Sequence, residues 1–419
     1  MKRLSKENRS RLFFTILILA VFCVGTSIPV AGVDKESLAQ IFNNENSGLF
    51  DLYNLFTGGS FQNFTLFALG ITPYITASII IQLLTIAFPY FENLAKEGET
   101  GRKKMASITR YATIALALIQ ATGMTVGLFR QAIIDKTTFT VIVIVATLTA
   151  GTTILMWLGE QINEYGIGNG MSLLIFAGIV VRLPIQVRDI ITKAKDGTLS
   201  WVAVILIALG ALAIIAAIIY VQGGIRKIPV QYAKRVSGRR MYGGQNTHIP
   251  IKLNSSGVIP IIFSVSILQF PITIGYFFPN SKYTDFVSKY LSTNGSVGVW
   301  VYMVLNILLI IAFTFFYTSI VFRPEDVANN LKNNGGAIPA IRPGKPTEEY
   351  LTKITNRLCL LDGLFLAAVA TLPTVIGNFT SINMAFGGTS LLILIGVAMD
   401  TVRQLNEREI MNQYSGFLK

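Results

Sequence analysis

The sequence predicts an all-α membrane protein with ten transmembrane helices, and three observations indicate this fold class. Hydrophobic residues make up 52% of the 419 residues and charged residues only 14%, whereas a soluble domain has about a quarter of its residues charged. The mean hydropathy is +0.56. Ten apolar runs follow one another along the chain, and a membrane helix needs about 20 apolar residues. A water-soluble core could not bury this much apolar surface.

The first predicted span follows a basic N-terminus, a pattern that a secretory signal peptide shares. Because the run is longer than a signal core and nine more spans follow, we expect an uncleaved helix. The fifth span is short. The last two share the uncharged stretch 363–399, which is too long for one span, so a turn is predicted at Gly377 and Asn378, after Pro373. The predicted spans are 12–30, 64–88, 107–129, 138–158, 167–182, 200–221, 256–278, 298–321, 356–376 and 383–400.

The positive charges predict the orientation of these spans. With the N-terminus in the cytoplasm, the inner segments are 1–11, 89–110, 159–166, 222–255, 322–357 and 401–419. They hold 26 of the 35 lysines and arginines, and the outer segments hold 9. Since positive residues are retained on the cytoplasmic side, both termini are expected to be cytoplasmic. The net charge of +13 therefore indicates membrane topology before it indicates a nucleic-acid ligand.

Ten spans with both ends on one side divide into five and five. The second set then has inverted topology relative to the first, as in inverted-repeat channels and transporters. This predicts an N-terminal half at 1–195 and a C-terminal half at 196–419, although the two halves share no evident sequence identity.

Residues 52–91 form an apolar segment of forty uncharged residues, twice what one helix needs. Its leading part, 54–63, contains Gly58 and Gly59, which would interrupt a regular span. Irregular backbone at this depth is tolerated only when it is buried in protein or lines a cavity. We therefore predict a re-entrant segment here, with an amphipathic surface loop as the alternative.

Two long inner segments carry many of the basic residues. Residues 222–255 contain β-branched and aromatic runs at 225–232 and 247–253 with glycines between them, which predicts a projecting β-hairpin with a basic tip. Residues 322–353 form a second long, ordered loop on the same side. The alternative for both is that their charges only anchor the topology.

Several kinds of chemistry are missing from the sequence. It has no phosphate-binding G-x-x-x-x-G-K-[ST] motif, and the glycines at 166–170 open a membrane helix, which favours close helix packing. Cys23 and Cys359 are interpreted as small core residues, and His248 has no metal-ligand partner at a suitable spacing. Ionisable residues lie near span ends rather than at span centres, which argues against an ion-coupled carrier. We expect no enzyme activity, no cofactor and no metal.

Motifs spread over nearly the whole chain resemble those of the bacterial SecY family, the pore-forming subunits of the Sec protein translocase. They include the second predicted span, the glycine-rich basic turn that follows it, the hairpin, and the I-R-P-G sequence of the second loop. The matching stretches are 67–84, 97–104, 109–111, 166–170, 232–235, 238–240, 247–248, 257–260, 322–324, 341–344 and 386–392.

The resemblance implies a clamshell of the two inverted five-helix halves around a central hourglass pore. At the waist of the pore, a ring of aliphatic side chains excludes ions by dewetting yet deforms around a passing chain. From the residues alone, ordinary helix packing is the default interpretation of each of these positions, and only the resemblance assigns them to a ring. The implied pore ring is Ile71, Ile75, Met171, Ile175, Ile262 and Ile393.

The resemblance also implies a plug at about 55–64, which includes Leu55, Phe56, Thr57, Gly58, Gly59, Ser60 and Phe61. A lateral gate towards lipid is implied between spans 2 and 3 and spans 7 and 8, with Ser78, Gln82 and Phe270 as candidates. The two inner loops are implied to dock the SecA motor and the ribosome. The docking candidates are Arg342, Lys234, Arg235, Arg239 and Arg240.

The implied function is a passive channel in the bacterial cytoplasmic membrane for preproteins, signal peptides and transmembrane segments. Its implied partners are SecE, SecG, SecA, the ribosome with its RNA, and membrane lipids. A secondary transporter and a ribosome-docking scaffold are the alternatives. The chain departs from common family residues at Cys23, Ala31 and Met171. These departures leave open whether it is the housekeeping channel or an accessory paralogue.

Overall fold

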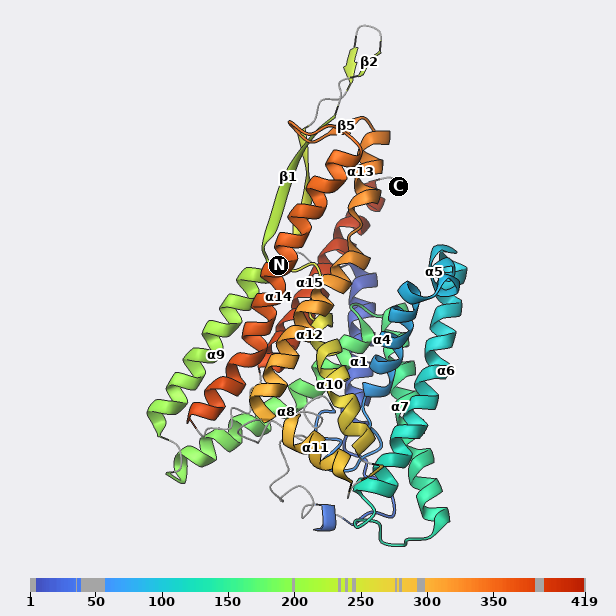
Figure 1. Cartoon of the computed structure of the whole chain (residues 1–419), viewed down its shortest axis with the longest axis vertical. Helices are drawn as coiled ribbons and strands as arrows, with labels where there is room; N and C mark the ends of the chain where they lie inside the picture. Colours follow the sequence, from blue (N-terminus) through green and yellow to red (C-terminus); the bar gives the residue numbers. More distant parts are fainter. Residues whose placement is uncertain are drawn as a thin grey trace.

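Long helices dominate the computed structural model, and a few strands project from one end of the molecule, here called the hairpin end (Figure 1). The structure describes residues 5–34, 36–38, 57–197, 200–232, 235–237, 240–242, 246–275, 277–278, 281–291, 298–380 and 388–417. The first and last helices begin and end close together, since Asn8 Nδ2 donates to Glu409 Oε2 at 2.6 Å.

Every predicted span overlaps a helix. In chain order these are α1 (Lys6–Gly25), α4 (Thr72–Ala87), α6 (Glu99–Gly123) with the π-helical turn η1 (Met124–Leu128), α7 (Thr138–Tyr165), α8 (Gly170–Lys195), α9 (Trp201–Gln222), α10 (Ile259–Gly275), α12 (Gly298–Val321), α14 (Lys345–Thr380) and α15 (Gly388–Phe417). Shorter helices are α5 (Pro89–Lys96), α11 (Lys282–Tyr290) and α13 (Pro324–Asn333).

The predicted count of ten membrane helices is not confirmed. Among the described residues, eight helices are long and apolar enough to cross a membrane, and the bent pair α4–α5 would make a ninth. The pair is bent by 99° at Phe88, which is extended ahead of Pro89, as the residue before a proline usually is. Helix α10 lies in the seventh predicted span but has only 17 residues.

Two predicted boundaries were wrong. The fifth span is not short, because α8 continues through Pro184 to Lys195 and has 26 residues. The turn predicted at Gly377 and Asn378 lies inside α14, which extends to Thr380. Glycine and proline therefore did not end these two helices in the way that their usual effect on helices suggests.

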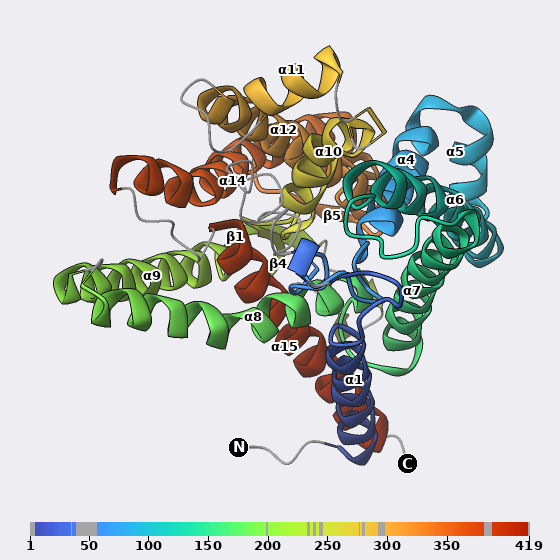
Figure 2. The same cartoon turned by 90° about the horizontal axis from the view of Figure 1, so that it is seen from below.

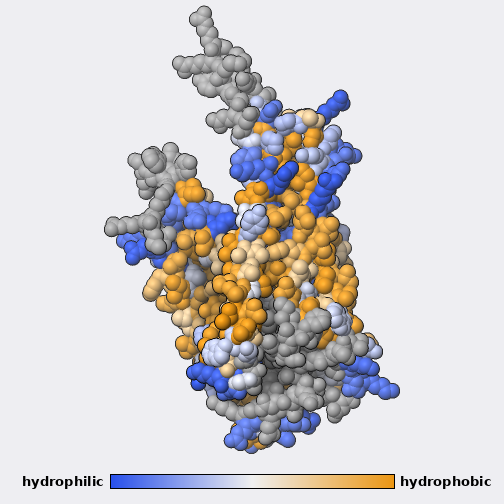
Figure 3. All heavy atoms as spheres, turned by 90° about the vertical axis from the view of Figure 1, so that its left-hand side faces the viewer, coloured by the Kyte–Doolittle hydropathy of each residue, from blue (hydrophilic) through white to orange (hydrophobic). Residues whose placement is uncertain are grey.

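On the face drawn in Figure 3, an apolar band crosses the middle of the molecule, and polar residues gather towards both ends. Helix α9 shows this most clearly, because only 6% of its most apolar stretch of 18 residues is buried. Its side chains Ile205, Leu206 and Leu209 are exposed. Exposed apolar surface of this extent fits a lipid environment or a partner helix.

The predicted β-hairpin is confirmed. Strands β1 (Ile225–Tyr232) and β4 (Asn246–Lys252) pair antiparallel, with Pro229 opposite His248. The short strands β2 (Arg235–Ser237) and β3 (Arg240–Tyr242) pair at the tip. The sequence did not predict β5 (Gly336–Ala337), which comes from the second inner loop and adds to the edge of β1.

Helix α10 lies where two groups of helices meet, since it packs against α12 on one side and α4 on the other. Seen from below, α4, α5, α6 and α7 lie on one side and α9, α12 and α14 on the other, with α10 near α4 (Figure 2). Helices α8 and α15 also pack together. The surface between α10 on one side and α4 and α6 on the other is called the seam below.

Candidate functional site

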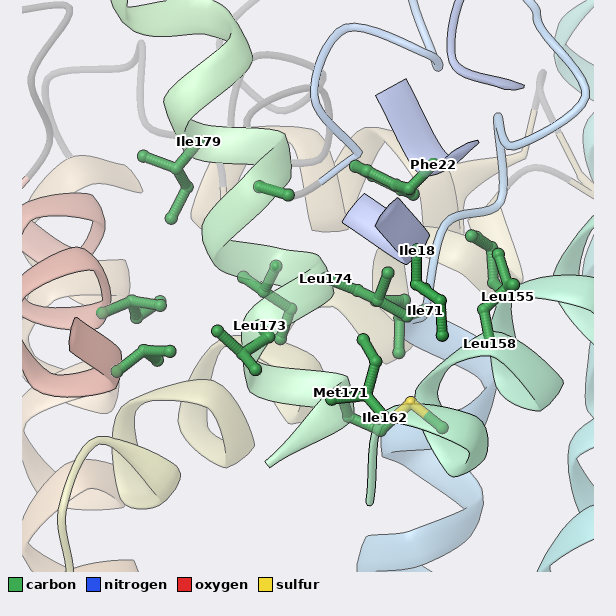
Figure 4. Close-up of a cluster of buried hydrophobic side chains, with 14 of the residues drawn as sticks. Ile18, Phe22, Ile71, Leu155, Leu158, Ile162, Met171, Leu173, Leu174 and Ile179 are labelled. Atoms are coloured by element: carbon green, nitrogen blue, oxygen red, sulfur yellow. The ribbon is translucent and has the colours of Figure 1, made fainter. Parts of the chain in front are cut away.

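The six residues of the implied pore ring lie in one cluster of buried side chains. Five of them are buried, and Ile75 is half-buried against the others. They come from four elements: the start of α4, α8, α10 and α15. Figure 4 shows Ile71 and Met171 in this cluster beside Leu174. The structure therefore brings together six side chains from both halves of the chain.

A very small cavity lies within the pore ring. Ile71, Ile75, Ile175 and Ile262 line it on the apolar side, and Thr72, Val265, Ser266 and Gln269 complete its wall. Its volume is about 10 Å³, the lower limit for holding one water molecule. The side chains that line this cavity are therefore closely packed.

The glycines at 166–170 place Met171 in the buried cluster that contains the implied pore ring. Asn169 caps α8 by accepting from the backbone N–H groups of Met171 and Ser172, at 3.1 and 3.3 Å. A side chain at Gly170 would lie 1.9 Å from the carbonyl oxygen of Gly159 on α7. The prediction of close helix packing at this motif is confirmed, since α7 and α8 approach with no room for a methyl group.

The described part of the predicted plug is a series of buried turns ahead of α4. Thr57, Ser60 and Phe61 are buried, whereas Leu55 and Phe56 lie outside the described residues. Phe61 packs edge-on against Phe129 with ring centroids 5.6 Å apart. Arg182 of α8 donates to Gln62 Oε1 at 3.1 Å. These turns are thus packed between α8 and the residues that follow η1.

Gly58 brings these turns directly against α8. Its φ is +64°, a left-handed conformation that favours glycine, and a Cβ there would lie 2.9 Å from Cα of Gly178. Gly178 follows Ile175 by three residues, which places both on one face of α8. The predicted plug residues therefore lie one helical turn from the pore ring.

Two of the three lateral-gate candidates lie together on α4, and the third lies on α10. Gln82 Nε2 donates to Ser78 Oγ at 3.3 Å within α4 itself. Phe270 on α10 is 44% exposed, whereas its neighbour Gln269 is buried and lines the cavity. Among the described residues, no hydrogen bond or ring contact joins Phe270 to Ser78 or Gln82.

Apolar side chains that sequence reasoning missed form the contact across the seam. Ile79 of α4 and Phe263 of α10 are buried in one cluster with Phe313 of α12. Gly123 at the end of α6 faces Phe277, whose ring would lie 2.4 Å from a Cβ at that position. The sequence shows these residues only as members of apolar runs, because their helix face is decided by packing.

The two inner loops form one unit at the hairpin end. Gln231 and Tyr232 of β1 pair with Ala337 and Gly336. Apolar residues of the hairpin and the second loop share a core, formed by Ile228, Val230, Ile251, Leu331, Ile338 and Leu351. Two loops far apart in sequence therefore make one rigid body.

The docking candidates lie on this unit, as far as the structure describes them. Arg342 is exposed, and its carbonyl accepts from Thr347 Oγ1 at 2.8 Å, which fixes the backbone ahead of α14. Arg235 and Arg240 belong to strands β2 and β3. Lys234 and Arg239 lie outside the described residues.

A second cavity of about 190 Å³ lies at the base of the hairpin. Lys252 of β4 and Arg403 of α15 line it, together with Asn254 and Asp400. Burial, and next to it the charge of Arg403, lowers the pKa of Lys252. Within the described ranges, no three histidine, cysteine or acidic residues come together as metal ligands.

Comparison with known proteins shows a consistent likeness over nearly the whole chain. A family model described as SecY matches residues 65–402. A protein translocase subunit SecY of Halalkalibacterium halodurans is 46% identical over 425 residues, covering 99% of this chain and 97% of the relative. A subunit of the same name from Vibrio cholerae is 43% identical, covering 99% and 94%.

Solved structures share the fold at lower identity. A structure described as that of a protein conducting channel has a TM-score of 0.71 and 20% identity, covering 97% of this chain and 95% of the other. Sec61 in a canine ribosome-channel complex from the endoplasmic reticulum has a TM-score of 0.67 and 18% identity, with the same coverage.

Proposed function

The chain belongs to the SecY family, the channel subunits of the protein translocase, and we propose that it passes unfolded preproteins across the bacterial cytoplasmic membrane. The observation that carries this proposal is the pore ring. Its six side chains come from both halves of the chain and share one buried cluster, and four of them line a cavity of about 10 Å³, the lower limit for one water molecule. Such a constriction resists water and ions, yet flexible aliphatic side chains deform around a polypeptide.

The predicted plug gives a second barrier on one side of the ring. Its described turns pack against the face of α8 that carries Ile175 and Gly178. Phe61 and Phe129 anchor them by an aromatic contact. We expect these turns to leave α8 when a preprotein enters, because the passing chain needs the space that they fill.

A lateral gate at the seam would release signal sequences and transmembrane segments into lipid. Ile79 and Phe263 meet there through apolar side chains. Apolar contacts across a membrane helix interface can be exchanged for contacts with lipid tails at small cost. An apolar signal helix could therefore replace α4 against α10.

Transport needs an external source of energy. No nucleotide-binding motif occurs in the sequence, so SecA or the translating ribosome would drive the polypeptide. The joined inner loops, with exposed Arg342, offer a docking platform at the hairpin end. Arg239 and Arg240 would contact ribosomal RNA phosphates in a salt-sensitive manner. Canine Sec61 is found in a ribosome-channel complex.

We further propose that SecE and SecG are companion subunits of this chain and that both of its termini lie in the cytoplasm.

Reconstitution tests this function. Vesicles containing the chain with SecE, supplied with SecA and ATP, should import a preprotein into a protease-protected space. Vesicles without ATP are the control. Absence of import by correctly inserted protein would contradict the proposal. Saturable uptake of a small solute by the chain alone would favour a transporter instead.

The same vesicles test the coupling role of Arg342. Arg342→Glu reverses an exposed charge where SecA would dock, so import should fall about tenfold or more, as loss of a charge-assisted contact predicts. The protein should stay folded and inserted. Arg188→Glu, an exposed charge reversal on α8 outside both inner loops, is the matched control. Normal import by Arg342→Glu would remove this residue from the docking site.

A further inference from the structure

Helix α10 is held by different kinds of contact on its two sides. On the side of α12, Ser264 Oγ donates to Asn306 Oδ1 at 2.7 Å, and both residues are buried. On the side of α14, Ser256 in the linker before α10 donates to Asp362 Oδ2 at 2.9 Å. Across the seam, no hydrogen bond or ion pair between described residues joins α10 to α4 or α6. Directional contacts thus hold α10 to α12 and α14, and apolar contacts hold it to α4.

The bond between Ser256 and Asp362 is fully enclosed. Each residue is 1% exposed. The linker that carries Ser256 is short and fixed, since Leu253 N–H donates to the carbonyl of Gly224 at 2.9 Å and Gly257 N–H donates to Asn254 Oδ1. Ser256 precedes Ile262 of the pore ring by only six residues. A displacement at Ser256 is therefore transmitted to the ring and to Phe263 at the seam.

Stability alone does not account for a carboxyl group at this place. Asp362 lies on α14 between apolar neighbours, and its Oδ1 atom has no partner among the described residues. Burying a carboxyl group with incomplete hydrogen bonding costs free energy that an apolar residue of similar size would avoid. Buried polar groups of this kind are most useful where they fix one geometry.

We propose that Asp362 is a positioning residue, which fixes the hairpin end of α10 to α14 so that α10, α12 and α14 move as one body when the seam opens. The inference rests on the proposed lateral gate at the seam. In the closed channel, the Ser256–Asp362 bond keeps Ile262 and Phe263 in contact with α4. Without it, α10 is freer to shift, and a weaker signal helix suffices to open the seam.

The test compares transport of two preproteins in cells, one with a full signal sequence and one with a signal of reduced hydrophobicity. Ser256→Ala and Asp362→Ala should raise the ratio of weak-signal to full-signal transport about fivefold, the factor that loss of one net hydrogen bond gives. Asp362→Asn keeps an acceptor oxygen and should stay near the wild-type ratio. A merely structural role would lower both transport rates and the amount of protein in the membrane together, leaving the ratio unchanged.

Two controls make the result decisive. Ser255→Ala removes the neighbouring hydroxyl, which donates to the carbonyl of Lys252 at the end of β4, at 3.0 Å. This variant should leave the transport ratio unchanged. Ile79→Ser alters the seam itself and should raise the transport ratio. If the single variants are poorly inserted, the double variant Ser256→Ala/Asp362→Ala decides the test, because removing both partners leaves no buried polar group without its hydrogen bond.

If Ser256→Ala and Asp362→Ala give the same ratio as Ser255→Ala while Ile79→Ser raises the ratio, the inference is overturned and the gate proposal stands. If Ile79→Ser also has no effect, the gate does not lie at this seam and both fail.

Discussion

At the scale of single residues, the proposed seal depends on side-chain volume more than on specific bonds. The pore ring consists of five isoleucines and one methionine, and no member except half-buried Ile75 is exposed beyond 7%. Aliphatic side chains hold water weakly, so a narrow constriction that they line stays dry. An amide in the same volume would hydrogen-bond water and hydrate the constriction.

Ile75→Asn and Ile393→Asn should therefore make the resting channel conduct ions. We expect about a tenfold or larger rise in the conductance of reconstituted membranes without preprotein, because a wetted constriction conducts. Ile205→Asn, on the exposed face of α9, is the matched control and should leave conductance at the wild-type level. Unchanged conductance in the first two variants would remove those residues from the ring.

The packing of single side chains could not be predicted from the sequence. The ring positions came from resemblance alone, since an isoleucine in a membrane span is typical of ordinary packing. The seam residues Ile79 and Phe263 were missed, and Asp362 was interpreted only as a residue near a span end. Which face of α4, α10 or α14 turns inward follows from contacts between helices, and an apolar run on a lipid-exposed helix carries little information about it.

At the scale of elements, the described turns of the predicted plug, 57–64, form the proposed movable barrier against helix α8. Gly58 has φ +64°, and a Cβ there would lie 2.9 Å from backbone of α8. A substitution meets both a backbone penalty of about 1–2 kcal/mol and a clash with atoms that cannot turn away. The barrier thus depends on a glycine at one position.

Gly58→Ala should weaken the packing of the plug on α8. We expect a several-fold rise in resting ion conductance with the pore ring intact. Gly98→Ala is the matched control, because Gly98 also has a positive φ, +72°, but nothing lies within 4 Å of its Cβ position. Equal conductance in the two variants would argue against a sealing role for Gly58, since the backbone penalty alone would then explain the effect.

Hydropathy and turn residues predicted most elements. Every apolar run overlaps a helix, and the hairpin has the predicted strands, because both patterns follow from local burial. The sequence did not predict β5, since two residues have no alternation pattern, or the full length of α8 beyond Pro184. The turn at Gly377 and Asn378 was misplaced, because α14 continues through both residues to Thr380.

At the scale of the whole molecule, the account describes a conduit without a motor. An apolar band crosses the face drawn in Figure 3, as a bilayer would require, and the joined inner loops lie at the hairpin end (Figure 1). The proposed pore ring would close the channel at its centre. The seam, where α10 packs against α4 through apolar side chains, is the line along which we propose that the molecule opens.

Photo-crosslinking of a stalled preprotein tests the central claim most directly. A photoreactive amino acid is placed at Ile75, Ile262 or Ile393 of the pore ring, and at Ile205 on the outer face of α9. A preprotein is then halted midway through transport. The account predicts adducts between the preprotein and all three ring positions and none at Ile205. Absence of adducts at the ring, or equal labelling at Ile205, would contradict transport through the centre of this chain.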